Sequence, residues 1–210
     1  MHKVPTKIGG EIPVSGVFVL DDIHTISEEA LRQFAADEKE ELESFTNLRR
    51  QREYVTSRLM LKEIAREQWD CSVFSVEKDE LGQPFGVSDS RKYYVSIAHS
   101  NEKVFCGIAE HVPIGIDLEP ADREPSEKLR RRILHPDEAE LLTDLQTIRL
   151  WTIKEAFIKL RGQGLRLNMN QVYVQEQEEA FTVEINNDKR AKICSFKMEN
   201  NWLAIAYYQQ

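Results

Sequence analysis

The chain has 210 residues, of which 41% are hydrophobic, so it can form a core and wholesale disorder is excluded. Its net charge of −8 argues against a general nucleic-acid binder. No apolar run approaches the about 20 residues that span a bilayer, and the N-terminus lacks the apolar stretch of a signal peptide. The three cysteines are far apart and predict neither a disulfide set nor a metal site. We therefore expect a soluble, cytoplasmic protein.

The first part of the chain shows an alternation of strand and helix patterns. After a loose leader at residues 1–13, residues 14–20 form a β-branched apolar run that is typical of a strand. Ser27 is a fair helix N-cap, residues 35–45 are acidic and helical, and Asn47 can cap a long helix that runs to about residue 69. Three further strands are expected at 71–77, 93–98 and 103–110. A turn at 79–84 and a hairpin turn at 99–101 should separate them.

The second part repeats this layout. A strand is expected at 114–119 and a helix at 146–161, separated by a polar stretch in which Pro136 suits a first helical turn. Four short strands that read as an antiparallel meander follow at 171–175, 181–185, 191–197 and 202–208. The coarse repetition of strand, helices and strands predicts a boundary near residues 112 and 113.

The helix at 146–161 has two different faces. Its apolar residues predict a core-facing stripe of Leu150, Ile153, Phe157 and Leu160. Trp151, Glu155 and Lys159 follow at i+4 steps on another face. Gly162 and Gly164 stand at the helix end, where a positive φ is needed. By itself this pattern also fits a surface ion pair followed by an ordinary glycine cap.

The stretch Ile114–Glu119, IGIDLE, carries two acidic residues two positions apart. On a strand, the side chains of Asp117 and Glu119 leave the same face about 7 Å apart, while Ile116 and Leu118 face the core. Two such carboxylates repel each other unless a cation or a proton compensates, and oxygen ligands suit Mg²⁺. The pair alone fits a solvated strand face equally well.

The long helix from residue 48 to 69 carries an excess of basic residues in an acidic chain. They are Arg49, Arg50, Arg52, Arg58 and Lys62. For any single arginine a solvated face is the better interpretation. For the cluster, an anion site and a solvated basic face remain equal alternatives.

Five stretches of the chain resemble motifs of the 4′-phosphopantetheinyl transferases, specifically the larger type that activates surfactin synthetase. GIDLE at 115–119 resembles the family's Gly-Ile-Asp-Ile-Glu motif, and WTIKEAFIKLRGQGL at 151–165 resembles its Trp-x-x-Lys-Glu-Ala/Ser motif with the following Lys and Gly-x-Gly-Leu. The other similar stretches are SRLMLK at 57–62, ELGQP at 80–84 and IAHS at 97–100.

This resemblance implies transfer of the 4′-phosphopantetheine arm of coenzyme A to a serine of an apo carrier protein, acyl or peptidyl, with release of adenosine 3′,5′-bisphosphate. It implies an α+β fold of two similar halves, residues 1–112 and 113–210, each a small, mostly antiparallel sheet with a packed long helix. The active site would lie between the halves, with coenzyme A contacts from the first and the metal site and catalytic helix from the second. A monomer is expected.

The resemblance also implies roles for the acidic residues. Asp117, Glu119 and Glu155 would hold Mg²⁺, or Mn²⁺, across the diphosphate. Glu155 is the candidate for accepting the serine proton, either directly or through a metal-bound water. Lys159 would reach phosphate oxygens and, with Glu155 and Asp117, completes the expected catalytic set. Trp151 is expected to be a packing residue.

Coenzyme A is expected to contact residues of both halves. Arg49 is the first choice for the 3′-phosphate and Arg52 the second, His99 would contact the phosphates, and Gln83 would lie near the adenine. Lys154 and Lys159 complete the expected set, with a packing role as the open alternative for Lys154.

The chain departs from the motifs at two positions. Ala98 stands where the hairpin motif has serine, and Gln83 stands where many relatives have lysine. These changes imply weaker coenzyme A binding, or compensation by the arginine cluster.

Carrier proteins are typically acidic around their serine, so a local basic patch is the expected docking surface. The candidates are Lys128, Arg130, Arg131 and Arg132. The alternative interpretation of these residues is a solvated helix face. We expect no nucleic-acid or membrane partner.

Two other function classes remain: a Mg²⁺-dependent phosphohydrolase without a protein acceptor, and a non-catalytic adaptor that binds coenzyme A or carrier protein. The three retained carboxylates argue against the adaptor.

Overall fold

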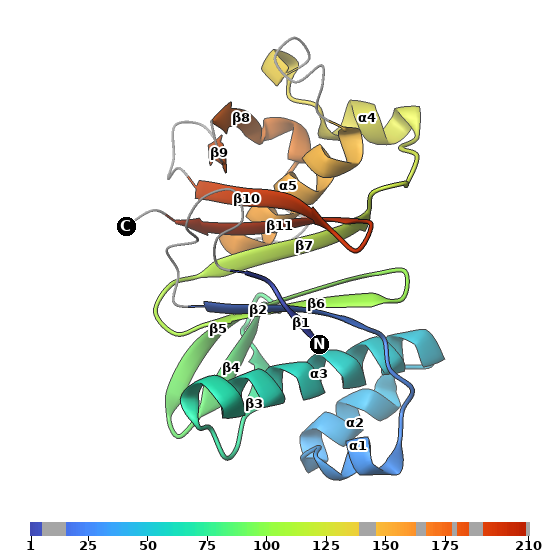
Figure 1. The fold of residues 1–210 in the computed structure, drawn as a ribbon, viewed down its shortest axis with the longest axis vertical. Coiled ribbons are helices and arrows are strands. Elements are labelled where there is room, and N and C mark those ends of the chain that lie inside the picture. The colour runs from blue at the N-terminus through green and yellow to red at the C-terminus, as the bar shows by residue number, and fades with distance from the viewer. Residues whose placement is uncertain (6–15, 139–145, 163–166, 178–179, 185–190, 209–210) are drawn as a thin grey trace.

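Two antiparallel sheets pack face to face, and helices cover their outer faces (Figure 1). The structure, a computed structural model, describes residues 1–5, 16–138, 146–162, 167–177, 180–184 and 191–208. The predicted α+β architecture, with two antiparallel sheets and a long helix on each, is confirmed. No helix in the described ranges is both long and apolar enough to cross a membrane.

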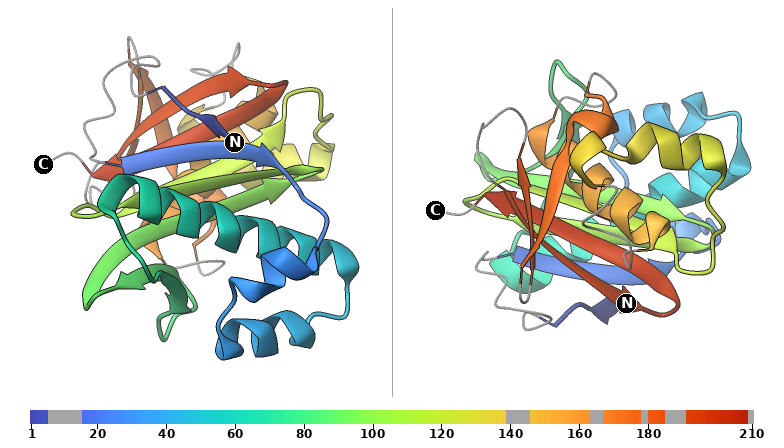
Figure 2. Two further views of the ribbon diagram at one scale, coloured as in Figure 1. Left: turned by 60° about the horizontal axis from the view of Figure 1, so that its bottom comes forward. Right: turned by 90° about the horizontal axis from the view of Figure 1, so that it is seen from above.

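The first sheet has six strands and is built from residues 2–109. In spatial order they are β1 (His2–Lys3), β2 (Gly16–Asp22), β6 (Lys103–Ala109), β5 (Arg91–Ser100), β4 (Pro84–Ser88) and β3 (Ser75–Lys78). The long helix α3 (Leu48–Trp69) covers its outer face, and the shorter helices α1 (Glu28–Arg32) and α2 (Ala36–Ser44) pack against α3 (Figure 2).

The second sheet has five strands and is built from residues 114–208. In spatial order they are β7 (Ile114–Pro120), β11 (Asn201–Tyr208), β10 (Ala191–Met198), β9 (Ala180–Glu184) and β8 (Tyr173–Gln177). The outer face is covered by α5 (Thr147–Arg161), with α4 (Glu127–Ile133) and the 3₁₀ turns Pro136–Glu138 and Met169–Gln171 beside it. The predicted meander of the last four strands is confirmed.

The helix ends follow from the capping residues that the sequence offers. The Asn47 side chain accepts hydrogen bonds from the backbone N–H groups of Arg49 and Arg50, and the Ser27 hydroxyl caps α1 in the same way. Gly162 takes the left-handed conformation after α5, with φ +66°. All three predicted caps are therefore confirmed, while Gly164 lies outside the described residues.

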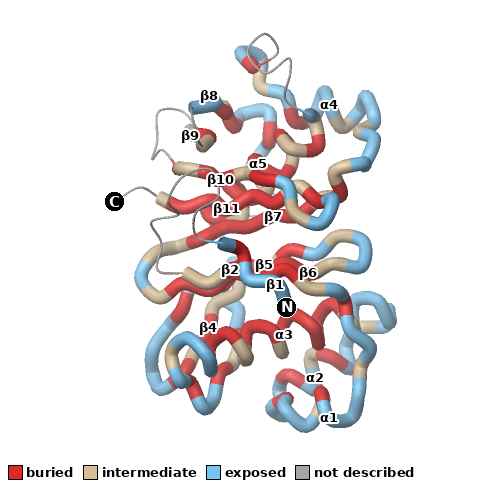
Figure 3. The backbone as a smooth tube through the Cα atoms, in the orientation of Figure 1, coloured by how far each residue is buried: buried red, intermediate tan, exposed pale blue. Residues whose placement is uncertain are grey.

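The buried core between the sheets comes from the alternation of residues along β7 (Figure 3). Ile114, Ile116 and Leu118 pack against the first sheet, where Phe18 and Phe105 are their partners. The opposite face of β7 carries Gly115, Asp117 and Glu119, as the period of two requires. This second face points toward α5, so the acidic pair lies under the helix and not in bulk solvent.

Gly115 allows α5 to approach β7 at backbone distance. A Cβ atom at this position would overlap the carbonyl oxygen of Ala156 and the backbone nitrogen of Leu160. The four predicted core residues of α5 are all buried at 0–4% exposure, in the core between α5 and the second sheet. The helix is thereby fixed directly above the acidic face of the strand.

Three expectations about local structure were wrong. Strand β4 starts at Pro84, inside what was read as a turn, because proline is tolerated at the first residue of a strand. The hairpin turn lies at Asn101 and Glu102, since Asn101 takes a φ of +52°, and His99 and Ser100 remain in β5. Residues 2 and 3 of the expected leader pair with β2.

We predict that Gly115→Ala lowers the free energy of unfolding by at least about 3 kcal/mol, because the added methyl group meets backbone and not a flexible side chain. Gly16→Ala, also in a strand, is the matched control, since its nearest contacts are 3.2–3.3 Å away. Urea unfolding of both variants checks the prediction. Equal losses of stability would contradict the close approach at Gly115.

Candidate active site

The acidic face of β7 and the second face of α5 meet on the outer side of the second sheet, where the first half borders it. The Lys159 ammonium donates hydrogen bonds to Asp117 Oδ1 (2.9 Å) and to the carbonyl oxygen of Ile97 in β5 (3.2 Å). Glu119 accepts hydrogen bonds from Arg123 (2.7 Å) and from the Ser100 hydroxyl (3.4 Å). Strand β7, helix α5 and strand β5 therefore converge on one site.

Burial and mutual repulsion raise the pKa of two of the carboxylates. Burial raises the pKa of Asp117 to about 6, against the attraction of Lys159. Burial, followed by the charge of Asp117, raises the pKa of Glu155 to about 7. A carboxylate with a pKa near neutrality can accept a proton from a substrate and release it again.

The residues of the site fit a hard divalent cation by their chemistry. Asp117 Oδ2 is buried without a hydrogen-bond partner, and Asp117, Glu119 and Glu155 offer only oxygen ligands. A bound cation would offset the repulsion that raises both pKa values. Among the described residues, however, no three acidic, His or Cys side chains are already grouped as a ligand set, and Lys159 occupies one oxygen of Asp117.

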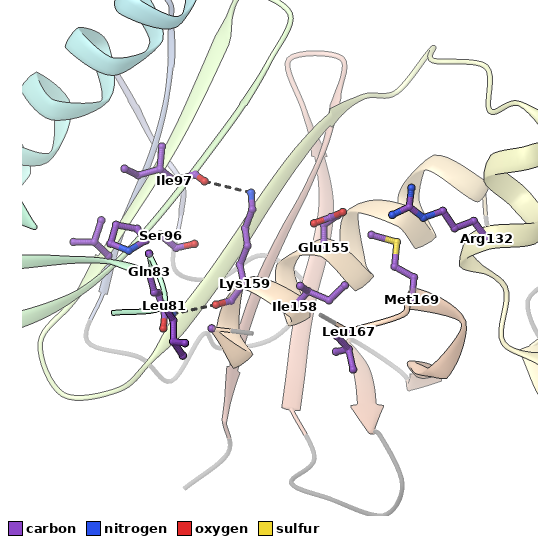
Figure 4. A pocket seen from close by; sticks show the side chains of 14 residues that line it. Leu81, Gln83, Ser96, Ile97, Arg132, Glu155, Ile158, Lys159, Leu167 and Met169 are labelled. Atoms are coloured by element: carbon purple, nitrogen blue, oxygen red, sulfur yellow. Dashed lines mark hydrogen bonds between the residues drawn. The ribbon is translucent and has the colours of Figure 1, made fainter. Parts of the chain in front are cut away.

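A cavity of about 330 Å³ opens beside these groups (Figure 4). The first half contributes the turn at Leu81–Pro84 and residues 95–97 of β5, and the second half contributes α5 and Arg132. Glu155 and Lys159 line it from the helix, and most of its other walls are apolar. The cavity is therefore a shared feature of both halves.

A second cavity of about 170 Å³ adjoins the first, because Pro84 and Ile97 line both. Arg50, Arg58 and Lys78 outnumber Glu41 and Glu53 in its lining, which makes it basic on balance, and His99 lines it as well. Arg50 donates to His99 Nε2 (2.9 Å). Burial lowers the pKa of His99, against the attraction of Glu53, which favours the neutral imidazole that can accept this bond.

Glu53 organises the arginines at this basic cavity. Its carboxylate, only 5% exposed, accepts hydrogen bonds from Arg49 (3.0 Å) and Arg50 (3.2 Å) and lies 3.5 Å from His99. From the sequence, Arg50 was named only as a member of the basic cluster and not as a coenzyme A contact, although its position three residues before Glu53 was a usable signal. Ser96, whose hydroxyl accepts a hydrogen bond from the backbone N–H of Ile116 and so joins the halves, was also missed.

The two arginines chosen from the sequence have other partners in the structure. Arg49 donates to Glu53 and to the carbonyl oxygen of Asn101, at the edge of the basic cavity. Arg52 donates to the carbonyl oxygens of Ile23 and His24, which ties α3 to the chain leaving β2. Arg50, and not Arg52, is therefore the arginine brought next to His99.

Lys154 is wholly buried and cannot face a ligand. Its ammonium donates to Glu138 (2.6 Å) and to the carbonyl oxygens of Ile133 (2.5 Å) and Met169 (3.3 Å). Glu138, also 0% exposed, accepts backbone hydrogen bonds from His135 and Val174 as well. The structure thus assigns Lys154 to packing, which corrects its placement among the coenzyme A-binding residues.

Two further sequence candidates pack inside the molecule. Ala98 is buried in the core between the sheets, 2% exposed, so its methyl group takes part in the contact between the halves. Gln83 points to the end of α5, where its amide donates to the carbonyl oxygen of Lys159 (3.1 Å). Trp151 is half-buried against the core beneath α5, and Arg123 lies over its ring at 5.9 Å, as expected of a packing residue.

We predict that Lys154→Met lowers the free energy of unfolding by about 3–5 kcal/mol, because it leaves the buried Glu138 carboxylate without its cation. The double variant Lys154→Met with Glu138→Gln should recover part of this loss, since it buries no unpaired charge and its amide oxygen still accepts one of the two backbone bonds. Urea unfolding of both variants measures the difference. A double variant no more stable than the single one would contradict the role of Lys154 as the cation that compensates Glu138.

We predict a pH-dependent gain of stability in Glu155→Gln. Between the ordinary pKa of 4.5 and the raised value of about 7, the folded state binds more protons than the unfolded chain, so stability falls as pH rises through this window. Glutamine cannot ionise and avoids this loss. In metal-free buffer, the melting temperature of the variant relative to the parent should therefore rise from pH 5 to pH 8. A constant difference would contradict the assignment.

Comparisons with known proteins agree with the family indicated by the motifs. Residues 113–207 match the family described as the 4′-phosphopantetheinyl transferase superfamily. The chain is 30% identical over 129 residues to 4′-phosphopantetheinyl transferase gsp of Aneurinibacillus migulanus. This alignment covers 58% of this chain and 52% of that protein. The chain is also 30% identical over 132 residues to 4′-phosphopantetheinyl transferase Sfp of Bacillus subtilis, covering 60% and 54%.

Two further similarities were found. A putative 4′-phosphopantetheinyl transferase of Synechocystis sp. is 27% identical over 174 residues, covering 73% of this chain and 71% of that protein. Among solved structures, the holo-[acyl-carrier-protein] synthase of Thermotoga maritima aligns with a TM-score of 0.40 and 25% identity over 47% of this chain and 64% of that chain. The matched part spans about half the length of gsp and of Sfp. The family match is thus confined to residues 113–207, the part of the chain that contains β7 and α5.

Proposed function

We propose that this protein transfers 4′-phosphopantetheine from coenzyme A to a serine hydroxyl of an apo acyl or peptidyl carrier protein. The observation that carries the proposal is the meeting of Glu155 and Lys159 on α5 with Asp117 on β7, beside a cavity that both halves line. The relatives gsp and Sfp, which are named as 4′-phosphopantetheinyl transferases, support the same reaction.

In this reaction the serine oxygen forms a bond to the phosphorus that bears the pantetheine, and the bond to the bridging diphosphate oxygen breaks. Adenosine 3′,5′-bisphosphate leaves. Glu155 accepts the serine proton, for which a pKa of about 7 is suited near neutral pH. Lys159, already beside Asp117, contacts phosphate oxygens and stabilises their developing charge.

Asp117, Glu119 and Glu155 would hold Mg²⁺, or Mn²⁺, with the buried unpartnered oxygen of Asp117 as one ligand. Such an ion supplies neutralisation of the diphosphate charge. The basic cavity at Arg50 and His99 receives the nucleotide end of coenzyme A, because it adjoins the cavity that Glu155 lines. Because both halves of one chain line these cavities, we propose a monomer, which light scattering of the purified protein would test.

The carrier protein docks beside the mouth of the larger cavity. Helix α4 carries Arg130 and Arg131, which are both exposed, and Arg132, which lines the cavity itself. An acidic partner surface suits this basic stretch. Arg131 is the best probe of docking, because it is exposed and paired only with the exposed Glu127 on its own helix among the contacts described.

The test is intact-mass spectrometry of an apo carrier protein incubated with this protein, coenzyme A and Mg²⁺. We expect a gain of one phosphopantetheine mass, and its loss with Glu155→Ala or with a chelator. Cleavage of coenzyme A without a modified carrier would instead indicate the phosphohydrolase. Binding of coenzyme A without any product, across several carrier types, would indicate the adaptor.

The same assay tests the docking surface. Reversal of charge in Arg131→Glu should raise the KM for the carrier protein by about fivefold and leave the KM for coenzyme A unchanged, because rim charges act on association with the protein partner. Glu127→Gln serves as the matched control, since it removes the partner of Arg131 without reversing the basic charge. An unchanged carrier KM in Arg131→Glu would remove α4 from the docking surface.

A further inference from the structure

The turn between β3 and β4 is ordered by its own first residue. Asp79 accepts hydrogen bonds through Oδ1 from the backbone N–H groups of Leu81 (2.9 Å) and Gln83 (2.8 Å). Gly82, with φ +82°, completes the reversal. A turn held in this way presents the side chain of Gln83 in a defined direction, toward the second half of the molecule (Figure 4).

The Gln83 amide meets the end of α5. Its Nε2 donates to the carbonyl oxygen of Lys159 (3.1 Å), which also accepts the N–H of the C-cap Gly162. Carbonyl groups in the last turn of a helix lack helical partners and carry partial negative charge, so an external N–H donor stabilises them. The contact requires glycine at position 162, because a Cβ atom there would overlap the Gln83 amide oxygen.

Lys159 is thereby held by the first half at both ends. Its backbone carbonyl accepts from Gln83, and its ammonium donates to the carbonyl oxygen of Ile97. Both bonds cross from one half to the other, and Figure 4 shows them on either side of the same lysine. The remaining ammonium contact, to Asp117, lies inside the site.

We propose that Gln83 is a positioning residue that fixes the last turn of α5, and with it the direction of the Lys159 side chain, and that it does not bind coenzyme A itself. The turn at Leu81–Pro84 closes one wall of the larger cavity as part of the same contact. This inference rests on the proposed transferase function for its kinetic consequence, but the hydrogen bond to α5 is a property of the free protein.

The test compares Gln83→Met, which keeps the length of the side chain and removes the donor, with Gln83→Glu, which places a carboxylate against the carbonyl oxygen. Glu80→Gln is the control on the same turn, because Glu80 is exposed and lines neither cavity. Each variant is purified as the full chain. Transfer kinetics are measured with coenzyme A and an apo carrier protein, and amide hydrogen exchange is measured without ligands on peptides covering residues 155–162.

For Gln83→Met we expect kcat to fall about tenfold while the KM for coenzyme A changes by less than about twofold, because a displaced Lys159 loses transition-state contacts and not ground-state binding. Exchange at the end of α5 should become about fivefold faster, as expected for the loss of one hydrogen bond. Gln83→Glu should exceed Gln83→Met in both effects, and Glu80→Gln should match the parent protein.

Two results would overturn the inference. A raised KM for coenzyme A with unchanged kcat would mean that Gln83 contacts the substrate directly. Parent-like kinetics and exchange in Gln83→Met would mean that the contact with Lys159 positions nothing, and the proposed function would stand. Absence of transfer by the parent protein would remove the proposed function, whereas the exchange data would still decide whether Gln83 holds α5.

Discussion

The close approach of α5 to β7 at Gly115 is the contact on which the site depends. Because position 115 has no side chain, the backbone of the helix near Ala156 and Leu160 lies directly against the strand. Asp117 follows two residues later on the same strand face, and Lys159 reaches it from the helix. The glycine of one motif is thus the reason that the charged residues of the other motif can lie within bonding distance.

Helix α5 contains two lysines in different surroundings, one buried inside the fold and one facing the candidate active site. Lys154 is enclosed with Glu138, and the hydrogen bonds described for both groups satisfy them within the fold. Lys159 faces a site in which two carboxylates carry raised pKa values and one buried oxygen has no partner. Carboxyl groups with raised pKa values cost stability in the free protein when they ionise, and such groups are typical of functional sites.

The site belongs to neither half alone. Lys159 and Gln83 bond across the boundary between the halves, and Ser96 accepts the backbone N–H of Ile116 from β7. The apolar core between the sheets holds these polar contacts in register. The cavity between the halves therefore has walls that are fixed by packing, which favours a pre-organised site for a ligand that spans both of them.

Much of the architecture could be read from the sequence, because it follows from local chemistry. Asn47, Ser27 and Gly162 cap helices where their side chains or φ angles permit it, and the apolar stripe of α5 is buried as its periodicity indicates. The strand β4 was missed because its short sequence begins with proline and looks like a turn. Strand identity here comes from pairing with β3 and β5, which is non-local.

The sequence by itself determined which chemistry the chain carries: two carboxylates on one strand face, a glutamate and a lysine one turn apart on a helix, and a basic helix. Only the tertiary structure decided which of these groups meet. It placed Arg50 beside His99 through their shared contact with Glu53, buried Lys154, and turned Gln83 toward α5. The physical reason is that residue spacing sets the face on which a side chain lies, whereas its partner depends on how two elements distant in the chain pack against each other.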